Sequence, residues 1–352
     1  MQELTSRERV IGSLKGEDVD RPPCFSGMGS VSIDALKGTE WNAALKDAEI
    51  MANLARASQN ECGMDSVVVP FDLNIEGEAL GGKVKFYEQR EAESLLYPLI
   101  PKKFVKRAED IQVPEKLDDR GRIPIVVEAI KKLKGTVGDE VAVGSYVLGP
   151  FTLAGQVMEL NELMKMALRD PGELTAILAL LKDVGSKVAD ILTGAGADYI
   201  TVRPMGAGMD LLSPRLFGKL VQPILKELVE GIDNLTILHM CGTATPLVEM
   251  LHDCGANTLS FDHKTDLSKA REILGEEARI FGDIDPAKVL LNGSKEDIER
   301  AVIKALESGV DGIMPGCDIW PLTPCSNIKA MVDATRKYGK EKWFRKSKQG
   351  ES

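Results

Sequence analysis

The chain has 352 residues, of which 43% are apolar and 28% charged, and its 44 basic and 54 acidic side chains leave a formal charge of −10. This composition is typical of a globular protein with its own core and excludes a disordered or fibrous chain. The acidic balance disfavours nucleic-acid binding, which needs a basic face. The chain opens without an apolar leader and has no run of about 18 uncharged apolar residues, so we expect no membrane span.

The six cysteines are spread along the chain without a short paired spacing. In a chain of this size such cysteines are typical of free thiols or metal ligands in a reducing compartment, not of a disulfide framework. We therefore expect a cytoplasmic protein with reduced thiols.

Helices are predicted from the residues that begin and end them. Thr5 and Glu8 form a capping-box pattern that opens a short helix, which should stop at Gly16. The last helix should end before Gly339 and leave residues 341–352 as a charged, flexible tail. The other helices are expected over about 42–62, 171–193, 214–231 and 294–308, with a short one opening at Asp285–Pro286.

Short β-rich runs lie between these helices. Several are continuously apolar, as in parallel strands covered on both faces. Eight strands are expected, at Cys24–Met28, Ser66–Phe71, Glu140–Tyr146, Asp198–Val202, Leu235–Met240, Asn257–Asp262, Arg279–Asp283 and Gly312–Cys317. This order predicts an α/β fold: one (β/α)8 barrel of the TIM type over residues 1–340, with a short N-terminal helical segment and a small insertion near 73–122.

Reactive side chains gather at the expected carboxyl ends of the strands, where barrels of this kind carry their chemistry. His239 and Cys241 are two residues apart on one strand and so point to the same face, and Cys317 ends a later strand. One nitrogen and two sulfurs favour zinc and leave its fourth position open. A structural zinc is disfavoured because such sites usually have four ligands. The alternative is that the cysteines are ordinary packing residues.

Other strand-end residues are candidates for substrate work. Asp72 is a candidate to orient substrate or accept a proton, and its alternative role is a cap at the strand end. Arg203 is suited to hold a sulfonate or carboxylate bidentately, and its alternative is a salt bridge to a nearby acid. Tyr146 is a candidate substrate contact. Asp318, beside Cys317, either supports that ligand or is simply solvated.

Short motifs spread over nearly the whole chain carry a family resemblance. They are Ser6–Val10, Val19–Pro23, Val69–Asp72, Gly149–Phe151, His239–Gly242, Gly282–Pro286, Asn292–Ile298 and Gly316–Cys317, with Thr323–Pro324 and Asn327. With these motifs the chain resembles the methylcobamide:coenzyme M methyltransferases, a branch of the uroporphyrinogen decarboxylase superfamily. In that branch the His-x-Cys pair and the distant cysteine bind zinc, which implies His239, Cys241 and Cys317. The resemblance also places Glu78 in the family's acidic stretch, as a catalytic candidate beside Asp72.

The resemblance implies an enzyme that moves a methyl group between a corrinoid protein and a small thiol similar to coenzyme M. A free thiol has a pKa of about 8.5 and is mostly protonated at neutral pH, and zinc would hold it as a thiolate. The chain has no Asp-x-His-x-x-Gly corrinoid-binding signature. We therefore expect the methyl-corrinoid to arrive on a partner carrier protein.

Three other functions stay open. One is the demethylation of a methoxylated or methylthio donor onto a corrinoid protein, with the metal as a Lewis acid. The second is uroporphyrinogen decarboxylase itself, which is disfavoured because no arginine follows Arg21 up to Gly29 to grip an acidic porphyrinogen. The third is a non-catalytic module that binds a corrinoid protein. We expect no nucleic-acid or membrane partner, and a homodimer is left open.

Overall fold

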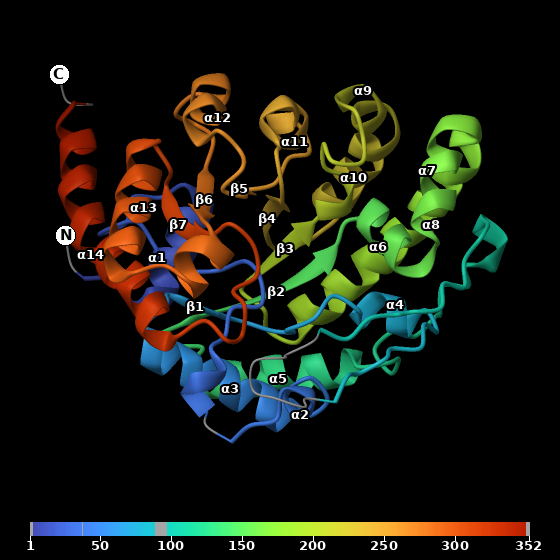
Figure 1. Cartoon of the computed structure of the whole chain (residues 1–352), viewed down its shortest axis with the longest axis horizontal. Helices are drawn as coiled ribbons and strands as arrows, with labels where there is room; N and C mark the ends of the chain where they lie inside the picture. The colour runs from blue at the N-terminus through green and yellow to red at the C-terminus, as the bar shows by residue number, and fades with distance from the viewer. Residues whose placement is uncertain (1–2, 37, 89–96, 350–352) are drawn as a thin grey trace.

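The computed structural model describes residues 3–36, 38–88 and 97–349 of the chain. A curved sheet of seven parallel strands forms its centre, and neighbouring strands follow one another in chain order. The helices surround these strands (Figure 1). The strands are β1 (Ser66–Val68), β2 (Ala142–Leu148), β3 (Tyr199–Arg203), β4 (Leu235–Met240), β5 (Thr258–Phe261), β6 (Ile280–Ile284) and β7 (Gly312–Pro315).

The eighth strand expected at Cys24–Met28 is not formed, and this part of the prediction is wrong. Cys24 makes only an isolated parallel bridge to Ile313 of β7. The backbone N–H of Asp65, next to β1, donates to the carbonyl of Cys24 (2.8 Å), so the segment lies between β7 and β1. No longer ladder forms, and backbone donors further along the segment bind side chains instead: the N–H of Ser26 donates to the hydroxyl of Ser66 (3.2 Å) and that of Met28 to the hydroxyl of Ser26 (3.1 Å).

Most expected helices are present, and several helices that were not expected form as well. Together these helices surround the sheet (Figure 1). They are α1 (Ser6–Lys15), α2 (Trp41–Ala44), α3 (Ala48–Cys62), α4 (Ile75–Ala79), α5 (Ile123–Thr136), α6 (Pro150–Val157), α7 (Leu160–Arg169), α8 (Pro171–Gly194), α9 (Pro214–Leu216), α10 (Gln222–Glu230), α11 (Val248–His252), α12 (Leu267–Leu274), α13 (Lys295–Glu307) and α14 (Cys325–Gln349). The short helix after Asp285 is a π-helical turn, Pro286–Leu291.

The prediction that the last helix ends before Gly339 is wrong. α14 continues through this glycine to Gln349. A Cβ atom at Gly339 would lie 2.9 Å from Cδ of Pro22. The glycine therefore serves close packing of the helix against the N-terminal segment, and its usual role as a helix stop is overridden by a tertiary contact. The assignment of residues 341–352 as a separate flexible tail stays a prediction.

α1 covers the amino-terminal end of the sheet. Its capping box is present, with the Thr5 side chain accepting from the Glu8 N–H, and Gly16 ends it in a left-handed conformation. Val10 and Leu14 of α1 pack into a buried cluster with inward-facing strand residues such as Tyr199. The helix therefore fills one end of the barrel-like sheet.

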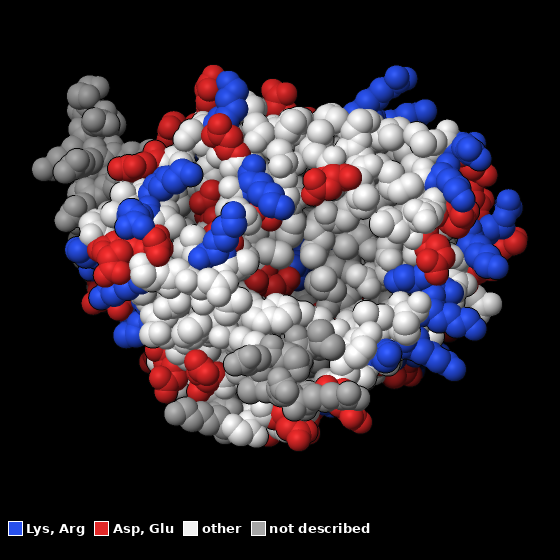
Figure 2. All heavy atoms as spheres, viewed as in Figure 1, with Lys and Arg blue, Asp and Glu red and all other residues white. Residues whose placement is uncertain are grey.

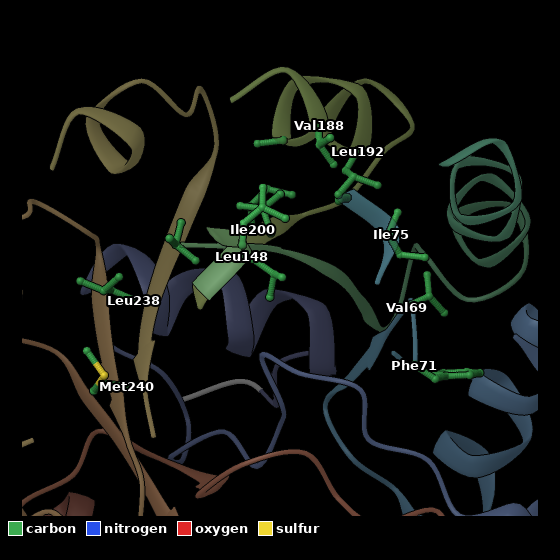
Figure 3. Close-up of a cluster of buried hydrophobic side chains, with 14 of the residues drawn as sticks. Val69, Phe71, Ile75, Leu148, Val188, Leu192, Ile200, Leu238 and Met240 are labelled. Atoms are coloured by element: carbon green, nitrogen blue, oxygen red, sulfur yellow. The ribbon is translucent and has the colours of Figure 1, made fainter. Parts of the chain in front are cut away.

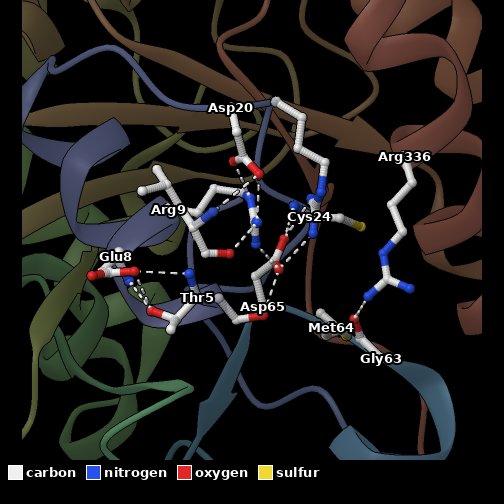
Figure 4. Close-up of polar contacts among 12 residues, drawn as sticks. Thr5, Glu8, Arg9, Asp20, Cys24, Gly63, Met64, Asp65 and Arg336 are labelled. Carbon is white, nitrogen blue, oxygen red and sulfur yellow. Dashed lines mark hydrogen bonds and ion pairs between the residues drawn. The ribbon is translucent and has the colours of Figure 1, made fainter. Parts of the chain in front are cut away.

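Buried charges tie this N-terminal region to β1. Asp65 accepts from Arg9 (2.9 Å) and from both terminal nitrogens of Arg21 (2.9 Å each), and Arg9 also contacts Asp20 (2.7 Å). Figure 4 shows Arg9, Asp20 and Asp65 directed toward one another. Every charge of this cluster has an opposite charge in direct contact, so the cluster is a structural clamp.

The main core lies between the outer face of the strands and the helices. Leu148 and Ile200, from β2 and β3, belong to the same buried cluster as Val188 and Leu192 of α8. Figure 3 shows these side chains next to one another. Burial of both sheet faces accounts for the continuous apolar runs in the sequence.

In its described residues, the predicted insertion near 73–122 contains α4 and little other regular structure. Between α4 and α5 it contains one isolated antiparallel bridge, Lys85 to Leu99, and a short 3-10 turn at Ala108–Asp110. Within the described ranges, no helix is both long and apolar enough to cross a membrane.

Candidate metal centre

His239, Cys241 and Cys317 meet at the carboxyl ends of two strands. His239 lies within β4, Cys241 follows β4 directly, and Cys317 lies two residues after β7. Nε2 of His239 is 3.2 Å from Sγ of Cys241, which is 3.4 Å from Sγ of Cys317. The possible ligand atoms of the three residues all lie within 4.8 Å of one another. The structure thus brings together residues that are up to 78 positions apart in the chain.

This donor set fits a zinc ion. Ligand bonds of about 2.0–2.3 Å from one centre suit donor atoms that are separated as these are. Burial, helped by the charge of Arg203, lowers the pKa of His239 to about 3, so its imidazole is neutral as a metal ligand must be. The hydrogen bond between the two thiols holds the pKa of Cys317 below its ordinary value and that of Cys241 well above it. A metal bound to both sulfurs would displace their protons.

Neighbouring side chains orient these ligands. Nδ1 of His239 lies 3.0 Å from the hydroxyl oxygen of Ser260, its partner in the β4–β5 register, which leaves Nε2 facing the sulfurs. Gly242 continues the chain after Cys241 with φ of +76°, and its N–H donates to the carboxylate of Asp262 (3.0 Å). The buried serine and aspartate thereby fix the ring and the turn that carry two of the three ligands.

Arg203 and Asp318 form an ion pair beside the thiols. Arg203 ends β3 and is fully buried, and its two terminal nitrogens donate to the two oxygens of Asp318 (3.1 and 2.5 Å). Its guanidinium lies 4.8 Å from the centre of the Tyr146 ring, and its Nε has no acceptor. Oδ2 of Asp318 lies 3.9 Å from Sγ of Cys317. The salt bridge considered for Arg203 is thus present, and one edge of the guanidinium remains without a partner.

The two predicted catalytic carboxylates share one arginine. Arg122 contacts Asp72 (2.5 and 3.0 Å) and Glu78 (2.7 Å). Asp72 also caps the turn at Asn74 and accepts from its N–H (3.0 Å), and its carbonyl accepts from the Tyr146 hydroxyl (2.8 Å). The structure links Asp72, Glu78 and Tyr146 in one network, and Tyr146 connects it to Arg203. Arg122 was not predicted as the shared partner of these carboxylates.

A buried carboxylate nearby was also missed. Glu76, on α4, is almost fully buried and accepts from the N–H of Leu148 (2.7 Å). Burial raises its pKa to about 7. The sequence signals for Glu76 and Ser260 were weak. Glu76 lies two positions from the Glu78 candidate, and Ser260 places a hydroxyl in the run Thr258–Phe261.

The surface over this region is hollowed. Figure 2 shows a depression in the middle of the molecule, with acidic and basic atoms visible at its bottom. The barrel-like parallel sheet, with one imidazole and two thiols at its carboxyl ends, defines the class: an α/β barrel-type protein with a candidate soft-metal centre.

The chain belongs to the uroporphyrinogen decarboxylase family, whose model matches residues 5–338. The "Methylcobamide:CoM methyltransferase MtaA" of Methanosarcina barkeri (strain Fusaro / DSM 804) is 32% identical over 341 residues, which cover 96% of this chain and 99% of that protein. The "Methylcobamide:CoM methyltransferase MtbA" of Methanosarcina acetivorans is 32% identical over 349 residues, with the same coverage. A solved "methyltransferase from Methanosarcina mazei" superposes with a TM-score of 0.89 at 31% identity, over 96% of this chain and 99% of that one. The resemblance drawn from the motifs is confirmed.

Proposed function

We propose that this protein is a zinc-containing enzyme that moves a methyl group between a corrinoid carrier protein and a small thiol. The convergence of His239, Cys241 and Cys317 on one point carries the proposal. It is supported by two relatives, 32% identical over nearly their full length, that are named as methylcobamide:CoM methyltransferases. Coenzyme M, the thiol in the names of those relatives, is the first candidate for the methyl acceptor.

Residues of the chain itself would bind the metal and fix the orientation of its ligands. His239, Cys241 and Cys317 would hold the metal, with Ser260 and Asp262 fixing their orientation. Bound zinc supplies a Lewis acid that lets the acceptor sulfur bind as a thiolate at neutral pH. In the transfer a carbon–sulfur bond forms with the thiolate electron pair. The methyl–cobalt bond of the carrier breaks with its pair left on cobalt, and the thiol proton passes to solvent.

Arg203 and Tyr146 are proposed to bind the small substrate. Arg203 is anchored by Asp318 and stacked on Tyr146, so its position is set before any ligand arrives. Asp72 and Glu78 are proposed to shape the same pocket by holding Arg122. A direct proton-transfer role for either carboxylate stays a prediction.

The decarboxylase alternative is disfavoured by the surroundings of Arg21. This residue is almost fully buried, and both of its terminal nitrogens are bound to Asp65. Its charge is therefore already matched by a buried carboxylate, whereas the several carboxylates of a porphyrinogen need matched cations of their own. The reverse reaction, from a methylated sulfur to the corrinoid, is a second candidate. It is favoured by a full-length relative named "Methylated-thiol--coenzyme M methyltransferase" (25% identical).

The metal content of variants tests the first part of the proposal. Elemental analysis under reducing conditions should find one zinc per chain in the wild type and a large loss in Cys317→Ala. Cys254→Ala is the matched control, because Cys254 is also buried but hydrogen-bonds only to backbone carbonyls. A wild type without stoichiometric zinc, or equal loss in both variants, would refute the proposed site.

The cobalt spectrum tests the second part. A methylated corrinoid protein, or free methylcobalamin, is mixed with the enzyme and a panel of thiols. The absorbance should change from that of methyl-cobalt to that of the reduced cobalt, and Cys317→Ala should abolish the change. If methylated sulfur compounds load the reduced corrinoid and no thiol accepts a methyl group, the second candidate replaces the first.

A further inference from the structure

The guanidinium of Arg203 has an unused edge. A guanidinium presents two bidentate edges, one formed by its two terminal nitrogens and one by Nε with the adjacent terminal nitrogen. Asp318 occupies the first edge with both of its oxygens. On the second edge, Nε is buried and has no acceptor. A buried donor without a partner costs stability, so this edge is suited to the two oxygens of an acidic ligand group.

This edge is held rigidly beside the candidate metal ligands. Arg203 is fully buried at the end of β3, with its guanidinium clamped between Asp318 and the Tyr146 ring. It donates to Oδ2 of Asp318, which lies 3.9 Å from Sγ of Cys317, so the guanidinium lies next to the donor set. A carboxylate bound there would find its partner already oriented, which limits the entropy lost on binding.

Asp318 offers a second, opposite contact point. Its side chain is 24% exposed, whereas that of Arg203 is 0% exposed. Each carboxylate oxygen accepts one bond from Arg203 and keeps a further lone pair for another donor. A partly exposed carboxylate with free lone pairs is a favourable place for an ammonium group.

The two contact points and the sulfur position lie close together. Oδ2 of Asp318 is 3.9 Å from Sγ of Cys317 and also contacts Arg203. One short molecule can therefore place a sulfur at the metal centre, an acidic group on Arg203 and an ammonium on Asp318.

We propose that the small-molecule substrate of this site is a zwitterionic thiol, an amino acid whose carboxylate binds the Nε edge of Arg203 and whose ammonium binds Asp318. The inference rests on the proposed function and narrows its substrate class. A thiol that carries only an acidic group, such as 2-mercaptoethanesulfonate, would satisfy Arg203 and leave Asp318 without its partner.

Thiols that differ by one charged group test this inference with the wild-type enzyme. Homocysteine is compared with 4-mercaptobutyrate, which lacks the ammonium, and with 3-aminopropanethiol, which lacks the carboxylate. Cysteine, 3-mercaptopropionate and cysteamine form a shorter set, and 2-mercaptoethanesulfonate is added. In the cobalt assay, loss of either charge should lower kcat/KM about tenfold or more, as expected for a lost charge-assisted contact.

Variants assign the two charges. Asp318→Asn should abolish the preference for homocysteine over 4-mercaptobutyrate, and Arg203→Lys should weaken every acidic thiol. Asp210→Asn is the control: Asp210 is an exposed acid whose carboxylate lies near Gly242, and its removal should leave the preference unchanged. Circular dichroism checks that each variant is folded, and the wild-type comparison stands even if Asp318→Asn does not fold.

Binding to the metal-free protein separates this inference from the proposed function. Calorimetry with methionine and with 4-(methylthio)butyrate needs no metal and no methyl transfer. Tighter binding of methionine, lost in Asp318→Asn, would support the inference even if no thiol accepts a methyl group. Equal binding of the two compounds, or equal kcat/KM for thiols with and without the ammonium, would overturn it.

Discussion

The two ends of the barrel-like sheet treat the same kinds of side chain differently. At the end covered by α1, Arg9, Arg21 and Asp65 are buried, and with the partly buried Asp20 they are bound to one another. At the other end Arg203 is just as buried, yet one edge of its guanidinium has no acceptor. A set of buried charges in which every group has an opposite partner serves the fold. A set in which one donor has no acceptor can bind a further ligand.

The largest effect on stability is expected at the end of the sheet that α1 covers. Asp65→Ala would leave two buried arginines without their shared carboxylate, and removing one partner of a buried ion pair costs about 3–5 kcal/mol. Urea unfolding should show this loss. Glu162→Gln, which removes an exposed ion pair with Lys165, should change stability by less than about 1 kcal/mol. Similar losses in both variants would mean that the buried cluster is no structural clamp.

A smaller, pH-dependent effect is expected from Glu76. Burial raises its pKa from the ordinary 4.5 to about 7, so between these pH values the folded chain binds more protons than the unfolded one. Stability contributed by this group therefore falls as the pH rises through that window, by up to about 3 kcal/mol, and the loss is complete above it. Glu76→Gln keeps an acceptor for the Leu148 N–H and has no such penalty.

Unfolding of Glu76→Gln and wild type at pH 5 and pH 8 checks this expectation. The variant should gain stability relative to the wild type as the pH rises. The raised pKa of Asp283, about 6, acts in both proteins and cancels in the comparison. A difference that is the same at both pH values would show that the Glu76 carboxyl does not titrate in this window.

The third effect concerns the metal ligands alone. Ser260→Ala removes the hydroxyl that contacts Nδ1 of His239, and the loss of such a partner usually costs about 10- to 100-fold in metal affinity. Zinc affinity is measured by competition with a chelator, and the spectrum of the cobalt(II) form reports ligand geometry. Ser145→Ala is the matched control, because Ser145 is equally buried but donates to the carbonyl of Val69. Equal affinities in the two variants would exclude a positioning role for Ser260.

Residue type and local spacing were enough to predict much of the site. A His-x-Cys pair on a strand and a cysteine after a later strand lead to the donor set, because parallel strands present their carboxyl ends on one side. The capping box at Thr5 was equally local, and the structure confirms it. The seven strands that form were visible as apolar runs, with ends shifted by a few residues.

The misses all depend on contacts between distant parts of the chain. Gly339 reads as a helix end until Pro22 is placed against it. In the sequence Asp72 has no evident partner, but in the structure Arg122, 50 residues away, donates to its carboxylate. The expected strand at Cys24–Met28 had a suitable composition, but beyond one bridge the N–H groups of Ser26 and Met28 donate to serine hydroxyls and not to a neighbouring strand. Spacing along the chain carries no record of such partners.

The position of residues 23–25 has a consequence for how the protein is made. The N–H of Phe25 donates to the carbonyl of Ile313, and the carbonyl of Cys24 accepts from Asp65. This segment is translated long before β7, which provides one of its two neighbours. Its contacts with β7 can therefore form only after β7 has been synthesised, because such distant contacts form late. Truncated nascent chains that stop before β7 should therefore be readily cut by proteases near residue 25.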